Sequence, residues 1–105
     1  RQVGAPYVVD AGHYRNQYIV HVVNKTPREG TFELRVVLPP AAAAAGATAV
    51  VPIPAVTLPS LGDQRVPVTV SVPLAAFDGG FEVTVETRDT ATGAVVASRL
   101  AFIGP

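Results

Sequence analysis

The side chains that could carry out metal or redox chemistry are few in this chain. Its 105 residues include no cysteine, no methionine and only two histidines, His13 and His21. A zinc or copper site usually takes three or four nitrogen, sulfur or oxygen ligands. Two histidines on one segment do not supply such a set, and without cysteine there is no thiolate or disulfide chemistry. We therefore predict two exposed histidines and no metal or cofactor site in this chain.

Paired carboxylates also lack the spacing that catalysis needs. Glu82 and Glu86 share one face of an expected strand, about 13 Å apart at ~3.3 Å per residue. A glycosidase pair needs about 5 to 9.5 Å between its carboxyl groups. No serine lies in a G-x-S-x-G context, and no glycine-rich phosphate loop precedes a helix. We expect Glu82, Glu86 and Arg88 to form a solvated sheet face, and no enzyme activity in this chain.

Charge and proline content exclude two further classes. Eight basic and eight acidic residues give a net charge of zero, and the basic ones are scattered. Nucleic-acid binding, which normally uses a basic face, is therefore not expected. The uncharged run 36–62 holds five prolines, and a membrane-spanning helix must satisfy its backbone internally. We expect this run to be part of a soluble domain.

Alternating apolar and polar residues predict β-strands, and residues 14–26 (YRNQYIVHVVNKT) show the clearest pattern. Successive strand side chains point to opposite faces, so one row can be buried while the other stays exposed. The inward row is predicted to be Tyr18, Val20 and Val22. The outward row is predicted to be Gln17, Ile19, His21 and Val23. Asn24-Lys25-Thr26 matches a glycosylation sequon, but capping of the turn before Pro27 is the stronger reading.

The rest of the chain reads as short strands separated by turns. Further strands are expected at 1–10, 31–38, 49–53, 55–58, 64–72, 81–87 and 94–103. The alanine-rich stretch 41–49 is too short for a stable helix and is expected to be a loop or a single turn. Pro52, Pro54 and Pro59 place 49–58 at a sheet edge, and Pro67 indicates a partly unpaired strand.

Seven to eight short strands with frequent turns and no clear helix are typical of one fold class. We predict an all-β immunoglobulin-like or fibronectin-III-like β-sandwich, without a disulfide, as a single domain over residues 1–105. Because the chain begins with Arg1, we expect it to be a fragment of a larger protein.

A set of polar and aromatic residues also forms a family-like pattern. It contains an R-N-x-Y run, an N-K-T run and a closing F-I-G-P run. The residues concerned are Arg1, Pro6, Asp10, Gly12, Arg15, Asn16, Tyr18, Asn24, Lys25, Thr26, Phe32, Leu34 and 102–105. This pattern resembles the C-terminal immunoglobulin-like domain of the FixG/CcoG proteins. These are membrane-bound, ferredoxin-like accessory proteins encoded with bacterial cbb3-type cytochrome oxidases. The chain departs from the family pattern at 11–14.

The resemblance implies a parent protein with transmembrane helices and 4Fe–4S clusters before Arg1. Such a parent supports copper handling, including Cu(II) reduction, during oxidase assembly in the bacterial inner membrane. This domain would follow the last membrane helix, on the periplasmic side, and hold no cofactor itself. Its role would be structural or docking, with oxidase assembly factors as partners.

The outward row of residues 14–26 is where a partner could bind. Ile19, His21 and Val23 form the predicted partner-contact residues, unless a second sheet or a loop covers them. The alternative is a free-standing binding module of an adhesin or secreted protein. A carbohydrate-binding version would need an exposed aromatic platform, for which Tyr7 and Tyr14 are the available side chains.

Overall fold

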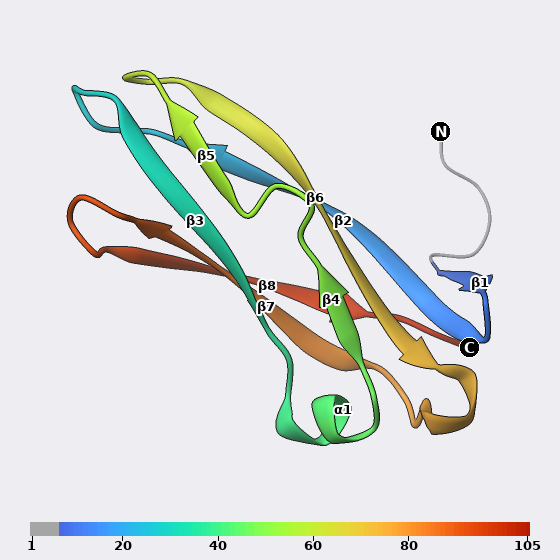
Figure 1. Ribbon diagram of the computed structural model, residues 1–105. Helices are drawn as coiled ribbons and strands as arrows, with labels where there is room; N and C mark the ends of the chain where they lie inside the picture. The colour runs from blue at the N-terminus through green and yellow to red at the C-terminus, as the bar shows by residue number, and fades with distance from the viewer. Residues whose placement is uncertain (1–6) are drawn as a thin grey trace.

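The computed structural model describes residues 7–105, which fold into two four-stranded antiparallel sheets packed face to face (Figure 1). Sheet A has the strand order β1-β2-β6-β4, and sheet B has the order β5-β3-β7-β8. The strands are β1 (Val8–Asp10), β2 (His13–Val23), β3 (Gly30–Val37), β4 (Thr48–Val50), β5 (Ala55–Leu58), β6 (Asp63–Pro73), β7 (Phe81–Asp89) and β8 (Val95–Phe102). The prediction of an all-β, immunoglobulin-like sandwich is confirmed.

The core lies between the inward rows of the two sheets. On β6, alternate valines point inward from Val66 to Val72, and on β7 Val83 and Val85 have no exposed surface. Phe102 closes one end, stacked on Phe81 with ring centroids 4.8 Å apart. β-branched side chains suit this packing because they fit the pleated surface of a strand.

The predicted facing of β2 is confirmed, although its tyrosine is less buried than its valines. Val20 and Val22 are buried, while Ile19 is 61 % exposed on the opposite face. Tyr18 shares the inward row but is only half-buried, because it lies where β2 reaches the edge of the sandwich. Its hydroxyl leaves the core and donates to the carbonyl oxygen of Ala101 at 2.9 Å.

Turn chemistry sets the strand connections much as the sequence predicts. The β1–β2 turn places Ala11 and Gly12 at positive φ, and the β7–β8 hairpin does the same at Gly93. The alanine tract forms a single short helix, α1 (Pro40–Ala44), and the crossing segment forms the 3-10 helix η1 (Leu74–Ala76). The predicted first strand covers residues 1–10. Its C-terminal part forms β1 (Val8–Asp10), and residues 1–6 lie outside the described part of the chain.

Prolines occur at or beside the sheet edges. Both β4 and β5 are edge strands, as predicted. β6 pairs with β2 along its whole length, but with β4 only from Thr69 to Ser71. Pro67 therefore has a strand neighbour on one side only, which a residue without an N–H tolerates.

Candidate functional site

An apolar row runs across the outer face of sheet A. Ile19 and Val23 project outward from β2, and Val23 is 40 % exposed. Pro67 of β6 lies directly across from Ile19, and Val50 on the neighbouring edge strand β4 is 57 % exposed. In residues 7–105, Ile19 is mostly exposed and Val23 partly exposed, so the sandwich presents apolar surface to solvent here.

His21 sits in the same row within a polar pair. Its Nε2 contacts the Oδ2 of Asp63, and both side chains are about half exposed (45 % and 52 %). Across the strand pair it faces Arg65. The row therefore combines two apolar side chains with an exposed imidazole–carboxylate pair.

Two asparagines that carry the family-like pattern are buried and structural. Asn24 has no exposed surface, and its amide nitrogen donates to the carbonyl oxygens of Arg28, Leu58 and Pro59 at 2.9 to 3.1 Å. Its carbonyl oxygen accepts from the N–H and the hydroxyl of Thr26. The turn-capping interpretation is confirmed, and a side chain enclosed in this way is not accessible to a glycosyltransferase.

Asn16, nearer the other end of β2, is a second buried asparagine whose side chain bonds to the backbone. It is 3 % exposed, and its amide both donates to the carbonyl of Ile103 and accepts from its N–H, each at 2.9 Å. The Tyr18 hydroxyl donates to the carbonyl of Ala101, two residues before Ile103. Burial raises the pKa of Tyr18 to about 12. Side chains of sheet A thereby hold the C-terminal segment of sheet B.

The sequence patterns thus point mainly to scaffold residues. The role of Asn16 was not predicted, because its partner lies 87 residues away along the chain. A polar residue in the inward row of a strand was the available signal, since buried amides are normally hydrogen-bonded. Asn16 lies within β2 and Asn24 directly follows it, so each run contributes a buried amide near one end of this strand.

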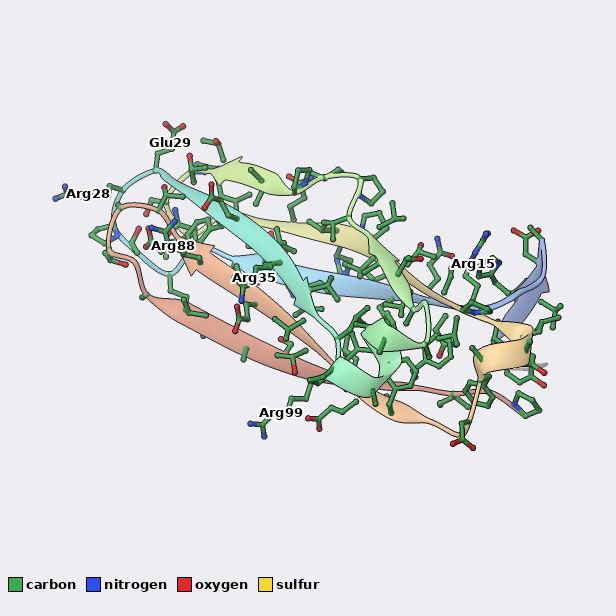
Figure 2. All side chains as sticks on the ribbon, turned by 60° about the horizontal axis from the view of Figure 1, so that its bottom comes forward. Arg15, Arg28, Glu29, Arg35, Arg88 and Arg99 are labelled. Carbon is green, nitrogen blue, oxygen red and sulfur yellow. The ribbon has the colours of Figure 1, made fainter. Side chains whose placement is uncertain are left out.

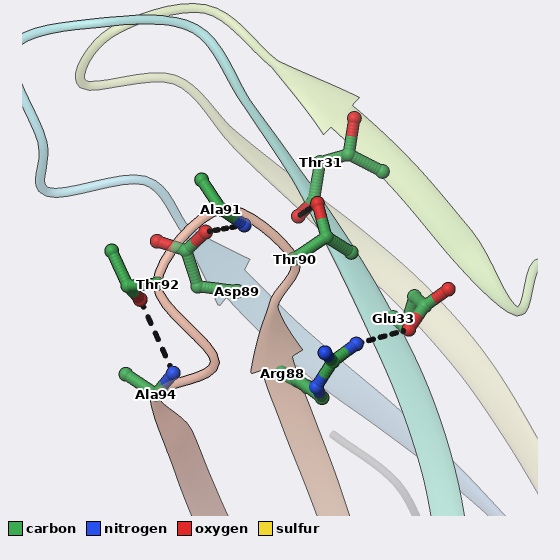
Figure 3. A network of polar contacts seen from close by, with 8 residues as sticks. All are labelled: Thr31, Glu33, Arg88, Asp89, Thr90, Ala91, Thr92 and Ala94. Atoms are coloured by element: carbon green, nitrogen blue, oxygen red, sulfur yellow. Dashed lines mark hydrogen bonds and ion pairs between the residues drawn. The ribbon is translucent and has the colours of Figure 1, made fainter.

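The outer face of sheet B carries surface ion pairs. Arg88 donates to Glu33 at 2.9 Å beside the β7–β8 hairpin (Figure 3). Glu86 lies 3.4 Å from Arg35, and Glu82 lies 3.9 Å from Arg99. The side chains of Arg35, Arg88 and Arg99 are 50 to 75 % exposed, and Figure 2 shows Arg99 projecting away from the ribbon. This face is the solvated polar surface that the sequence predicted.

The aromatic platform required for carbohydrate binding is not formed. Tyr7 and Tyr14 meet edge to face with centroids 5.4 Å apart, and both are half-buried. Tyr14 packs in turn against Phe77 at 5.1 Å. Stacking against a sugar ring needs an open aromatic face, and these rings use theirs against each other.

Neither metal nor membrane features were found in the described residues. Within 7–105, no group of three or more His, Asp or Glu side chains is arranged to hold a metal ion. His13 instead makes a hydrogen bond to the carbonyl of Ala11, far along β2 from His21. No helix in this range combines the length and the apolar character needed to cross a membrane.

Comparison with known proteins identifies the family. A family model described as "IG-like fold at C-terminal of FixG, putative oxidoreductase" matches residues 1–105. The chain belongs to this family. A FixG-related protein from Vibrio parahaemolyticus shares the fold, with a TM-score of 0.73 and 15 % identity over 89 % of this chain and 81 % of that chain. A search of curated protein sequences found no match.

As a FixG C-terminal domain, the chain is part of a protein described as an oxidoreductase. Protein-bound 4Fe–4S clusters are generally held by cysteine thiolates. The chain contains no cysteine, so its own residues do not fit a 4Fe–4S cluster.

Proposed function

We propose that this domain is a non-catalytic docking module of a membrane-bound iron–sulfur protein that supports cbb3-type oxidase assembly and copper handling. In this proposal the domain lies on the periplasmic side of the bacterial inner membrane and binds a protein of the oxidase assembly machinery. The observation that supports docking is the uncovered apolar row of Ile19 and Val23 beside Pro67 on sheet A.

The geometry of this row favours a protein partner over a small ligand. The row is part of a sheet face, and exposed apolar side chains on such a face are a common component of protein interfaces. Ile19 and Val23 are four residues apart on one strand, roughly 13 Å at 3.3 Å per residue. A partner surface can span that distance, whereas a small molecule would contact only one of them.

The test uses the full-length parent protein in its own membrane. Ile19→Asp with Val23→Asp places two carboxylates on the row without touching the core. We expect the amount of assembled oxidase to fall several-fold, while Cu(II) reduction per iron–sulfur cluster stays unchanged. The matched control is Val37→Asp, which alters an exposed valine on the outer face of sheet B.

Two results would count against the proposal. Normal oxidase assembly in the double variant would remove the docking role from this face. Loss of Cu(II) reduction in a variant that still folds would show that the domain takes part in the redox chemistry.

A further inference from the structure

The four terminal strands of the two sheets differ in how well they resist pairing with another chain. β1 and β4 have three residues each, and β5 has four and lies between Pro54 and Pro59. Short strands and prolines are the usual protection of an exposed sheet edge. β8 has eight residues, contains no proline and carries Arg99 as its one charge. Within residues 7–105, it pairs with β7 alone.

The backbone groups on the free side of β8 follow from the hairpin register. Asp89 N–H donates to the carbonyl of Ala94 at 2.9 Å, which makes this a hydrogen-bonded pair. In an antiparallel ladder such pairs recur at every second residue. The even-numbered residues of β8 therefore bond to β7. The N–H and C=O groups of Val95, Ala97 and Arg99 point to the free side.

Two contacts support this alternation and define where the open stretch ends. The carbonyl of Ala101 accepts the Tyr18 hydroxyl, and both backbone groups of Ile103 bond to the Asn16 amide. These odd-numbered residues face away from β7, as the register requires. Side chains of β2 occupy this end, so the open stretch is residues 95–99.

The inward row of β8 is open over the same stretch. Val96 is 68 % exposed, whereas Val85 in the same row of β7 is fully buried. A groove of about 350 Å³ lies here between β2 and the β7–β8 hairpin, with Val22 and Phe32 among its lining residues. The groove separates β2 of sheet A from the β7–β8 hairpin of sheet B, and Val96 at its border stays exposed.

We propose that β8 pairs with β8 of a second copy of this chain, antiparallel and centred on Ala97. A two-fold axis at Ala97 places Val95 opposite Arg99 of the second copy, and Val96 opposite Ser98. The three free N–H and three free C=O groups of each copy then all find partners. Because identical surfaces meet, the contact is self-complementary and closes as a dimer.

Charge favours this register and an identical partner. Arg99 faces a valine in the second copy, so the two cations of the dimer are not opposed. The chain has zero formal net charge, so there is no net electrostatic repulsion between two copies. A pair of strands is a small interface, so we expect a dissociation constant on the order of 10⁻⁴ M. The inference concerns β8 and does not depend on the docking role of sheet A.

The first test is sedimentation velocity of the 105-residue chain over a concentration series from roughly 10 µM to 1 mM, bracketing that constant. We expect a reversible monomer–dimer equilibrium. Val95→Lys, which opposes a cation to Arg99, should weaken dimerisation roughly tenfold, and Val95→Glu should strengthen it. Ala97→Pro removes a donor that β7 does not use and should abolish the dimer. Ile19→Lys, the matched charge change on sheet A, should leave it unchanged.

Amide hydrogen exchange followed by NMR reads the register directly. The amides of Val96 and Ser98 should be protected at every concentration, since they bond to β7. Those of Val95, Ala97 and Arg99 should gain protection only where the dimer forms. A chain that stays monomeric throughout, or exchange at 95, 97 and 99 that is independent of concentration, would overturn the proposal. The proposal would also be overturned if Ile19→Lys abolished the dimer while the β8 variants left it intact.

Discussion

Replacing Asn24 by alanine is the most informative test of how the fold is held at the turn after β2. The side chain is fully buried, and its amide nitrogen lies within 2.9 to 3.1 Å of three carbonyl oxygens. Its carbonyl oxygen accepts from the backbone N–H of Thr26 at 3.0 Å and from its hydroxyl at 2.7 Å. Alanine removes all of these contacts and leaves buried partners without replacement.

The magnitude follows from the number of contacts. A typical hydrogen bond contributes about 1 kcal/mol net, and a buried group left unpaired costs about 1 to 3 kcal/mol. The Asn24 amide shares two protons among three carbonyls and accepts two further hydrogen bonds. Asn24→Ala should therefore lower the free energy of unfolding by roughly 3 to 5 kcal/mol. This loss is a large part of the free energy of unfolding of a typical domain, which is ~5 to 15 kcal/mol.

The assay is equilibrium unfolding in urea, compared with Lys25→Ala at the exposed neighbouring position. We expect Lys25→Ala to change the free energy of unfolding by no more than about 0.5 kcal/mol. Asn24→Asp keeps the shape but loses the donors, so it should cost at least as much as Asn24→Ala. A loss below about 1 kcal/mol for Asn24→Ala would refute the view that this amide holds the turn.

Three further outcomes can be checked by the same unfolding measurements. His21→Ala should change stability by less than about 1 kcal/mol, because the pair with Asp63 is exposed; a larger loss would show that β2 faces the other way. Burial raises the pKa of Tyr18 to about 12, so the folded state holds this proton more tightly than the unfolded state. Stability should therefore fall from about pH 10 to 12, and Tyr18→Phe should flatten that fall. Gly80→Ala should destabilise, because an added Cβ would lie 2.7 Å from the backbone oxygen of Phe102; an unchanged midpoint would show that the backbone yields easily.

The strand rows were predictable because their signal is local. Alternation in residues 64–72 and 81–87 depends only on which side chains share a face, and burial of those valines follows. The outward position of Ile19 and Val23 could be predicted for the same reason. That nothing in the described residues covers them could not be read from the pattern, since it depends on how the two sheets assemble.

The buried asparagines show where local reasoning ends. Asn24 caps a turn within four residues of itself, so turn chemistry predicts part of its role. Asn16 bonds to Ile103, and no periodicity links residues that far apart. The exposure of Val96 in the inward row likewise depends on how the two sheets pack and not on the sequence around it. Long-range pairing is the information that a single sequence lacks.

The measurement that tests the docking account most directly is site-specific photocrosslinking in the full-length parent protein. A photoreactive amino acid replaces Ile19 in one sample and Val37, on the opposite sheet, in the other. The account predicts a discrete adduct between Ile19 and a second protein of the oxidase assembly machinery, and none at Val37. No adduct at Ile19, or equal adducts at both positions, would contradict it.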